Sequence, residues 1–267
     1  MSVQLTGLTI FPVKSAKGIE LTEAEVGFRG LDHDRRWMVV DDGGKFLTQR
    51  TLPKLALIQV AYADHQLHLN APGQSSLLVT QPNADAETTD VDVWGDRCLA
   101  QTAGKAAADW LTHFLSTPCQ LVYMPETTHR PVDHGKFEGD RGVSFADAYP
   151  YLLISEASLQ DLNQRLDTPI LMNRFRPNLV VSGCKAFAED SWQIIRIGTV
   201  PFRVAKPCSR CTIPTVDQHT GQRGPEPLKT LATYRAWDGK IWFGQNLIPL
   251  TEGTIRLGDG VEIDPEL

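Results

Sequence analysis

The chain has 267 residues, of which 42% are hydrophobic and 22% charged, and its formal net charge is −6. This profile is typical of a globular protein with one large or two modest domains, and the net charge argues against a general nucleic-acid-binding surface. The first residues lack a basic start, Pro12 and Lys14 interrupt their apolar run, and no apolar run reaches the length of a spanning helix, so we expect neither a signal peptide nor a membrane segment.

Short apolar runs separated by turn residues dominate the chain and predict β-strands. Turn signals include DDGG at 41–44 and GDG at 258–260. The predicted strands lie at 8–13, 36–42, 45–49, 57–63, 77–81, 91–96, 152–155, 178–183, 194–204 and 241–250.

Apolar residues at helical spacing predict two helices, at 104–116 and at 155–166, the second with Ser155 as its N-cap. A third, shorter helix is predicted at 227–236, with Pro227 in its first turn. Few helices among many strands indicate a β-rich α+β protein.

The polar segment 124–144 carries Pro, Gly and His and predicts a long functional loop or a hinge between halves. We interpret His129 and His134 within it as solvated loop residues rather than metal ligands. A boundary near 95–125 would separate a smaller N-terminal half from a larger C-terminal half.

The chain has 5 cysteines, an odd number in a chain too long to need disulfides, which favours a reducing compartment and free or ligating thiols. Cys208 and Cys211 form a CxxC pair with several interpretations. Structural zinc needs two more ligands, and none is suitably spaced. A redox pair needs a following helix, which Pro214 would break. Both thiols could be small buried hydrophobes, yet nearby cations such as Arg210 favour a thiolate that binds a soft metal or acts as a nucleophile.

The sequence KPCSRCTIPTVDQHTG at 206–221 resembles the signature of the MOSC family, which is named for the C-terminal domain of molybdenum cofactor sulfurase. The likeness is greatest to the mitochondrial amidoxime-reducing component and to the YcbX-type proteins of bacteria, and it covers nearly the whole chain. The other matching stretches are FPVKSAKG at 11–18, DRRWMVVD at 34–41, FADAYPYLLISEASLQDLNQRL at 145–166, NRFRPNLVVSGCKAFAEDSW at 173–192 and LGDGVEI at 257–263. The resemblance implies an N-terminal MOSC-type β-barrel domain at 1–118 and a C-terminal MOSC β-barrel domain with a few helices at 119–267.

The resemblance also implies a molybdenum cofactor, with the thiolate of Cys211 as the protein's ligand to the metal and as a catalytic residue. The expected contacts to the pterin and its phosphate are Lys14, Ser15, Arg35, Arg176, Asn178, Ser209, Arg210 and Cys211. Guanidinium, ammonium and hydroxyl groups suit a phosphate, and an amide suits a pterin ring.

Taken singly, these residues also have ordinary structural interpretations. Lys14 and Arg35 would usually be solvated surface charges, Arg176 could close a turn beside Pro177, and Asn178 could cap a strand. Their joint occurrence with Cys211 favours the cofactor. We further expect Arg210 to keep Cys211 ionised and residues 212–216 to form a strand that carries the ligand into a barrel.

The implied reaction is reductive cleavage of an N–O bond, in which two electrons and two protons convert a small N-hydroxylated substrate into an amine or amidine and water. Asp147 is the catalytic candidate for proton delivery, with the loop residues His129, His134 and Asp140 beside it. The remaining cysteines offer no iron–sulfur motif, so we expect no cluster in this chain and a separate electron donor, a flavoprotein or ferredoxin. Without the targeting segment of its mitochondrial relatives, we expect a cytoplasmic bacterial form with no membrane or nucleic-acid partner.

Two other functions stay open at the level of sequence. Cys211 could carry molybdenum cofactor or sulfur without turnover, since MOSC domains are attached to cofactor sulfurases. The chain could also be a β-barrel binding module without a cofactor, although the intact FRPN and CSRC sequences argue against that interpretation.

Overall fold

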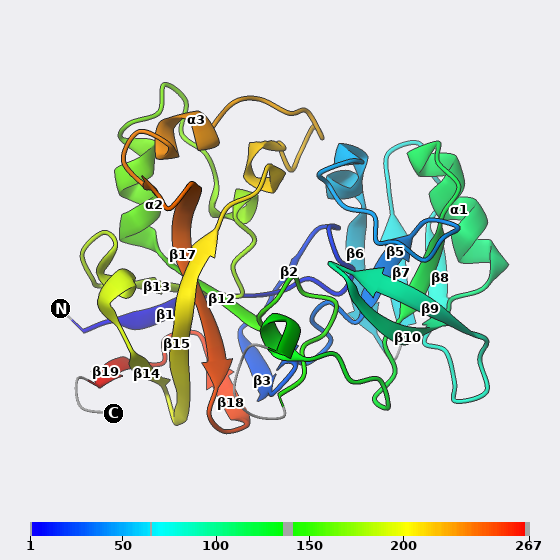
Figure 1. The fold of residues 1–267 in the computed structure, drawn as a ribbon, viewed down its shortest axis with the longest axis horizontal. Coiled ribbons are helices and arrows are strands. Elements are labelled where there is room, and N and C mark those ends of the chain that lie inside the picture. The colour runs from blue at the N-terminus through cyan, green and yellow to red at the C-terminus, as the bar shows by residue number, and fades with distance from the viewer. Residues whose placement is uncertain (1, 65, 136–140, 265–267) are drawn as a thin grey trace.

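The strands of the protein form four sheets, in a computed structural model that describes residues 2–64, 66–135 and 141–264 (Figure 1). The largest sheet has nine strands in the order β19-β14-β15-β17-β12-β13-β1-β2, with β16 paired to β17. These strands are β1 (Gln4–Ile10), β2 (Ile19–Glu20), β12 (Tyr151–Ser155), β13 (Leu179–Ser182), β14 (Ile194–Ile197), β15 (Val200–Ser209), β16 (Ala236–Trp237), β17 (Lys240–Pro249) and β19 (Val261–Asp264).

Three smaller sheets complete the fold. One has the order β5-β11-β10-β9, the second β18-β3-β4 and the third β6-β7-β8. Their strands are β3 (Glu23–Gly27), β4 (Gly30–Leu31), β5 (Trp37–Val40), β6 (Gln59–Ala63), β7 (Gln66–Asn70), β8 (Leu77–Thr80), β9 (Thr88–Val93), β10 (Asp96–Thr102), β11 (Gln120–Tyr123) and β18 (Gly253–Arg256). In Figure 1, β5–β10 lie in one lobe and most strands of the nine-stranded sheet lie in the other.

Helices are few, as the sequence predicted, and the β-rich α+β class is confirmed. The described residues form α1 (Lys105–Leu115), α2 (Glu156–Asn163), the single turn α3 (Leu228–Leu231) and five short 3₁₀ turns. The side chain of Ser155 caps α2 by accepting a hydrogen bond from Ser158 N, as expected. No helix in the described part of the chain is long and apolar enough to cross a membrane.

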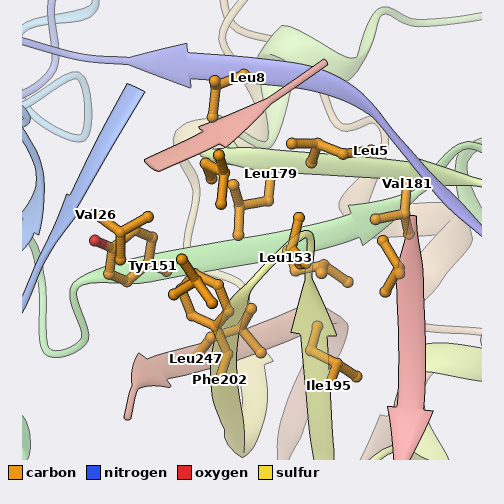
Figure 2. Packing of buried hydrophobic residues seen from close by; sticks show 14 of the residues in the cluster. Leu5, Leu8, Val26, Tyr151, Leu153, Leu179, Val181, Ile195, Phe202 and Leu247 are labelled. Carbon is orange, nitrogen blue, oxygen red and sulfur yellow. The ribbon is translucent and has the colours of Figure 1, made fainter. Parts of the chain in front are cut away.

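The first strands of the chain belong to the same lobe as its C-terminal half. Strand β1 pairs antiparallel with β13, and β3 pairs antiparallel with β18. Figure 2 shows the consequence for the core, where Leu5 and Leu8 of β1 pack with Leu153 and Phe202 from distant parts of the sequence. Val13 and Ala16, a few residues further along the chain, belong to the core of the other lobe. The N-terminal segment therefore contributes to both cores, and the domain boundary at 118 stays a prediction.

A pair of buried glutamine side chains joins the segment after β5 to the loop after Cys211. The amides of Gln49 and Gln218 donate to each other, at 3.0 and 2.9 Å, and Gln49 also donates to Ser15 O at 2.7 Å. Arg223 adds hydrogen bonds to the carbonyl oxygens of Gln49 and Arg50. These contacts hold residues of the two lobes in fixed positions relative to each other.

Several expectations about local structure are wrong. The runs at 91–96 and 194–204 are not single strands, because each crosses a hairpin turn, at 94–95 and at 198–199. The helix expected at 227–236 is only the turn Leu228–Leu231. Residues 45–49 form no strand, because Lys45 and Phe46 make only isolated bridges after the Asp41–Gly44 turn. Residues 212–216 are not a strand either, since Ile213–Thr215 is a 3₁₀ turn. Pro214 fixes its own φ and donates no backbone hydrogen bond, which suits a turn better than a strand. The long strand β15, which ends at Ser209, is the element that carries Cys211 into place.

Replacement of Gln218 by Ala should lower the free energy of unfolding by about 1–3 kcal/mol, because it leaves the buried amide of Gln49 without its partner. In a double-mutant cycle with Gln49→Ala, measured by chemical denaturation, the two changes should be non-additive. Gln101 is also buried but donates to Asn83 O, so Gln101→Ala should add to Gln218→Ala without coupling. Additive effects of Gln49→Ala and Gln218→Ala would show that the two side chains do not stabilise each other.

Candidate functional site

One cavity, at the meeting of the two lobes, collects the residues that the sequence singled out. Its lining includes all nine predicted site residues, namely Lys14, Ser15, Arg35, Asp147, Arg176, Asn178, Ser209, Arg210 and Cys211. Other lining residues are Arg50, Tyr149, Arg174, Phe175, Cys208 and Asn246. All nine residues therefore lie together in one cavity, and the role of each stays a prediction.

Lys14 enters the cavity from the segment that follows β1 and is only 4% exposed, so it is not a solvated surface charge. Its Nζ donates to Phe145 O and to Asp147 Oδ1, both at 2.6 Å. Burial lowers the pKa of Lys14 to about 8, although the neighbouring Asp147 carboxylate raises it. The ammonium group is therefore charged at neutral pH and loses its charge in mildly alkaline solution.

Asp147 is the only acidic residue among the described residues that line the cavity. Its Oδ2 accepts from Arg50 Nη2 at 2.6 Å, and its Oδ1 accepts from Lys14 Nζ and, at 3.2 Å, from Trp94 Nε1. The side chain of Asp147 is half exposed in the mouth of the cavity. Desolvation raises its pKa, but the charges of Lys14 and Arg50 outweigh this and hold the pKa of Asp147 well below its usual range. Asp147 is thus an ionised counter-ion at neutral pH.

The loop that carries Asp147 is fixed by Arg130, whose side chain is 1% exposed. Arg130 donates to the carbonyl oxygens of Ser144, Ala146 and Asp147 at 2.9, 2.6 and 2.7 Å, and it pairs with Asp96 at 3.0 Å. Part of the segment 124–144 is therefore a buried support of the cavity wall.

Arg35, Arg176 and Asn178 form a second group of polar residues in the cavity. Arg35 pairs with the buried Asp34 and donates to Asn178 Oδ1 at 3.1 Å, while Arg176 donates to Ala16 O at 2.6 Å. Both guanidinium groups lie on the ring of Phe11, at 4.7 and 4.1 Å from its centroid. Burial and the neighbouring Arg35 lower the pKa of Arg176 to about 9.

Three of the predicted site residues have left-handed backbone conformations. The φ angles of Ser15, Arg35 and Arg176 are 70°, 52° and 58°. For residues with a Cβ such conformations cost roughly 1–3 kcal/mol each and persist where the surrounding structure fixes them, which is common at functional sites. None of these three residues is a glycine, so the sequence alone does not predict their left-handed conformation.

The thiols lie at and after the end of β15, where Ser209 pairs with Trp242 and Arg210 N donates to Ile241 O at 2.7 Å. The expected role of Arg210 beside Cys211 is not what its contacts show. Arg210 Nη1 lies 3.0 Å from Cys208 Sγ, and Nη2 donates to Phe175 O at 2.8 Å.

Arg50 lines the cavity together with Cys211 and interacts with it electrostatically. Burial alone would lower the pKa of Arg50, but the Asp147 carboxylate and, after it, Cys211 raise the pKa above its usual value. On the other side of the loop, Arg174 pairs with Asp217 at 2.8 Å. Cys211 thus lies in a loop whose two flanks are held by arginine residues.

The electrostatic balance of the cavity fits an anionic ligand. Six cations line it, and three carboxylates, from Asp34, Asp147 and Asp217, pair with them. Four buried guanidinium nitrogens have no hydrogen-bond partner among the described residues, namely Arg50 Nε, Arg50 Nη1, Arg176 Nη2 and Arg210 Nε. A ligand with phosphate or other anionic groups would supply the missing acceptors, and the thiol of Cys211 would suit a soft metal.

Sequence reasoning missed Arg50, Arg174 and Trp94. Arg50 follows Gln49 in an irregular segment, and Trp94 occupies the tip of the β9–β10 hairpin, so no periodic pattern marks either residue. Of the loop residues suggested for proton delivery, His129 is not among the described residues that line the cavity. Asp140 lies outside the described residues, and the side chain of His134 does too.

Comparisons with known proteins agree on the family. Residues 2–118 match the MOSC N-terminal beta barrel domain, and residues 140–262 match the MOSC domain. Mitochondrial amidoxime-reducing component 1 of Mus musculus is 39% identical in an alignment of 272 positions that covers 95% of this chain and 80% of the relative. The Homo sapiens protein of the same name is 38% identical in an alignment of 275 positions that covers 95% of this chain and 81% of that protein. The molybdenum cofactor sulfurase of Danio rerio is 37% identical over 265 residues, which cover 91% of this chain and 31% of that protein. The chain therefore belongs to the MOSC family, with a MOSC N-terminal β-barrel domain followed by a MOSC domain.

Proposed function

We propose that this protein reduces small N-hydroxylated compounds, such as amidoximes, with a molybdenum cofactor and with electrons from a separate donor protein. The observation that supports it best is the cavity itself, in which a cysteine lies among six cations and four buried nitrogens that lack an acceptor. The similar amidoxime-reducing components, named for their activity, supply the class of substrate.

In this proposal Cys211 is the protein's ligand to the metal, and the cations hold the anionic parts of the cofactor. Lys14, Ser15, Arg35 and Arg176 would receive the phosphate and pterin, with Asn178 offering its amide and Ser209 and Arg210 flanking the ligand. The guanidinium groups of Arg35 and Arg176 are fixed on Phe11 before any ligand binds, which reduces the entropy lost on binding.

The reaction breaks the N–O bond of R–NH–OH, takes up two electrons and two protons, and releases R–NH₂ and water. Molybdenum, when bound, would supply the two electrons at the substrate. The protein's part is to orient the substrate, stabilise charge on its oxygen and bring protons to it. Because Asp147 is ionised, it acts by holding Lys14 and Arg50 in place, and any proton that it passes on must first reach it from one of them or from water.

The electron donor is expected to be a flavoprotein or ferredoxin, because no iron–sulfur motif was found in the sequence. This partner, the absence of a cluster and the cytoplasmic location stay predictions from sequence.

A carrier of molybdenum cofactor or sulfur is the second candidate, and the similarity to the molybdenum cofactor sulfurase of Danio rerio favours it. A carrier must release what it binds, whereas a reductase keeps its cofactor through many turnovers. Retention of the cofactor therefore separates the two functions.

Protein purified from a host that makes molybdenum cofactor should contain one molybdenum per chain, measured by mass spectrometry, and Cys211→Ala should contain none. Cys208→Ala is the matched control, since it removes the other thiol of the cavity and should keep the metal. Wild-type protein without molybdenum or pterin would move the assignment to the sulfur carrier.

Asp147→Asn should lower kcat by about 10²-fold, because Lys14 and Arg50 lose their shared counter-ion while the size of the side chain is kept. The metal content should not fall, since the change removes a negative charge beside an anionic cofactor. The measurement is turnover of an amidoxime with a chemical reductant, corrected for molybdenum. Full turnover by the loaded variant would remove Asp147 from the mechanism.

The charge of Lys14 should make anion binding depend on pH. With a pKa of about 8, the ammonium group is charged below that pH and neutral above it, so the affinity of the cofactor-free protein for sulfate should fall by about ten- to hundred-fold between pH 7 and pH 9.5. Sulfate does not titrate in this range, and binding can be followed by calorimetry. Lys14→Met should bind more weakly at pH 7 and show a smaller decline, confined to the range near pH 9 in which Arg176 also loses its charge. An equal decline in both proteins would exclude Lys14 as a cause.

A further inference from the structure

Arg50 is a largely buried arginine that lines the cavity with Cys211 and has hydrogen-bond donors without acceptors. Its side chain is 16% exposed and its Nη2 donates to Asp147 Oδ2 at 2.6 Å. Nε and Nη1 are buried and have no hydrogen-bond partner among the described residues. A buried donor left without an acceptor costs about 1–3 kcal/mol. The fixed position of Arg50 therefore indicates that Nε and Nη1 bind an acceptor that does not belong to the chain.

The surroundings of Arg50 distinguish it from the other cations of the cavity. Arg35 and Arg176 lie together on Phe11 and interact with Asp34 and the carbonyl of Ala16. Arg50 instead pairs with Asp147 at 2.6 Å and lines the cavity together with Cys211, with which it interacts electrostatically. If Cys211 binds the metal, Arg50 is the guanidinium that faces the reacting atoms, while the Phe11 group suits the remote end of the cofactor.

The position of Arg50 is fixed from three directions. Asp147 binds Nη2, Arg223 donates to the carbonyl oxygen of Arg50 at 2.7 Å, and the indole ring of Trp94 lies 4.7 Å from the guanidinium carbon. Such a restrained guanidinium loses little entropy when it binds an oxygen, and it is pre-organised for charge that develops during a reaction.

Trp94 is held in this place by the hairpin between β9 and β10. Its φ is 60°, followed by Gly95 at 92°, and it is 46% exposed, which is unusual for so large an apolar side chain. The indole Nε1 donates to Asp147 Oδ1 at 3.2 Å while its face covers Arg50. Trp94 therefore acts as a positioning residue for the Arg50–Asp147 pair, supplied by the N-terminal lobe.

We propose that Arg50 is a catalytic residue, whose free N–H groups donate to the oxygen of the substrate's N–O group, and that Trp94 positions it. The inference rests on the proposed reductase function. As the N–O bond breaks, the departing hydroxide gains negative charge before one proton converts it to water, while the other proton goes to the nitrogen, and a guanidinium stabilises the charge on the oxygen. Arg50 keeps its own proton throughout, the two electrons come from the external donor protein through the cofactor, and the two protons come from water.

The test uses the molybdenum-loaded protein with benzamidoxime and a chemical reductant. Arg50→Lys keeps the charge and the pairing with Asp147 but cannot reproduce the planar donor set, and we expect kcat to fall by about 10²–10³-fold. Molybdenum content and melting temperature should stay at wild-type values. Trp94→Ala should cause a smaller loss of kcat, and Trp94→Phe, which keeps a ring over Arg50, should recover part of it.

Arg165→Lys is the matched control. Arg165 also pairs with an aspartate, Asp161 at 2.9 Å, and lies on an aromatic ring, that of Tyr234 at 4.2 Å, but it is not among the described residues that line the cavity. This variant should keep wild-type turnover, so a loss confined to Arg50→Lys cannot be assigned to breaking such a cluster in general.

A second measurement does not depend on turnover. Benzamidoxime binding to the oxidised, loaded protein without reductant, measured by calorimetry, should weaken about tenfold in Arg50→Lys. If wild-type protein binds benzamidoxime but does not reduce it, the proposed function fails, and the weaker binding by the variant still supports the contact with oxygen. Equal affinities or unchanged kcat in Arg50→Lys would overturn the inference, and so would a loss of molybdenum that accounts for the lost activity, because Arg50 would then be a cofactor ligand.

Discussion

The carboxylate of Asp147 is the interaction on which the rest of the cavity depends. It binds Lys14 from the N-terminal segment and Arg50 from the segment after β5, and it accepts from Trp94 at the tip of a hairpin. Several cations cannot be buried close together in a fixed arrangement without a counter-ion, because their mutual repulsion and the cost of desolvation act in the same direction. One acid therefore sets the positions of side chains from three separate parts of the chain.

The remaining cations are held by two further acids, since Asp34 pairs with Arg35 and Asp217 with Arg174, and by the conformation of the backbone. Arg35 and Arg176 occupy left-handed backbone positions and lie on the same phenylalanine ring, and Arg176 retains a buried nitrogen without an acceptor among the described residues. Left-handed backbone and unmet donors both cost free energy in the free protein. A bound anion would recover part of that cost, so ligand binding and stability should be coupled through mass action.

The sequence predicted the class of fold and the neighbourhood of the site, and it failed where tertiary contacts decide. The helices at 104–116 and 155–166 show a clear helical period, and the Ser155 cap is a local feature, so both were accessible from the sequence. The nine predicted residues could be identified because they belong to long stretches that resemble the MOSC family, and the fold brings these stretches to one cavity. Arg50 and Trp94 have no local signal, since their importance arises only where the N-terminal lobe meets the loop of Asp147.

The errors have the same origin. Residues 45–49 contain a short apolar run like that of a strand, yet a single strand without a partner ladder gains little, and only isolated bridges form there. Arg210 precedes Cys211 in sequence, but its guanidinium meets Cys208 instead. In both cases the local sequence led to an expectation that tertiary contacts did not meet.

The construction of the cavity bears on the choice between a reductase and a carrier. A carrier works best when its ligand leaves easily, which favours contacts that open without disturbing the fold. Here the loop of Cys211 is joined to the N-terminal lobe by the buried Gln49–Gln218 pair, and it is held on its other flank by Arg174 and Asp217. Opening this site to release a large cofactor would break buried amide hydrogen bonds, each of which is expensive to leave unmade. A rigid cavity with fixed donors beside the thiol suits repeated turnover on a retained cofactor, and this is the physical reason to prefer the reductase.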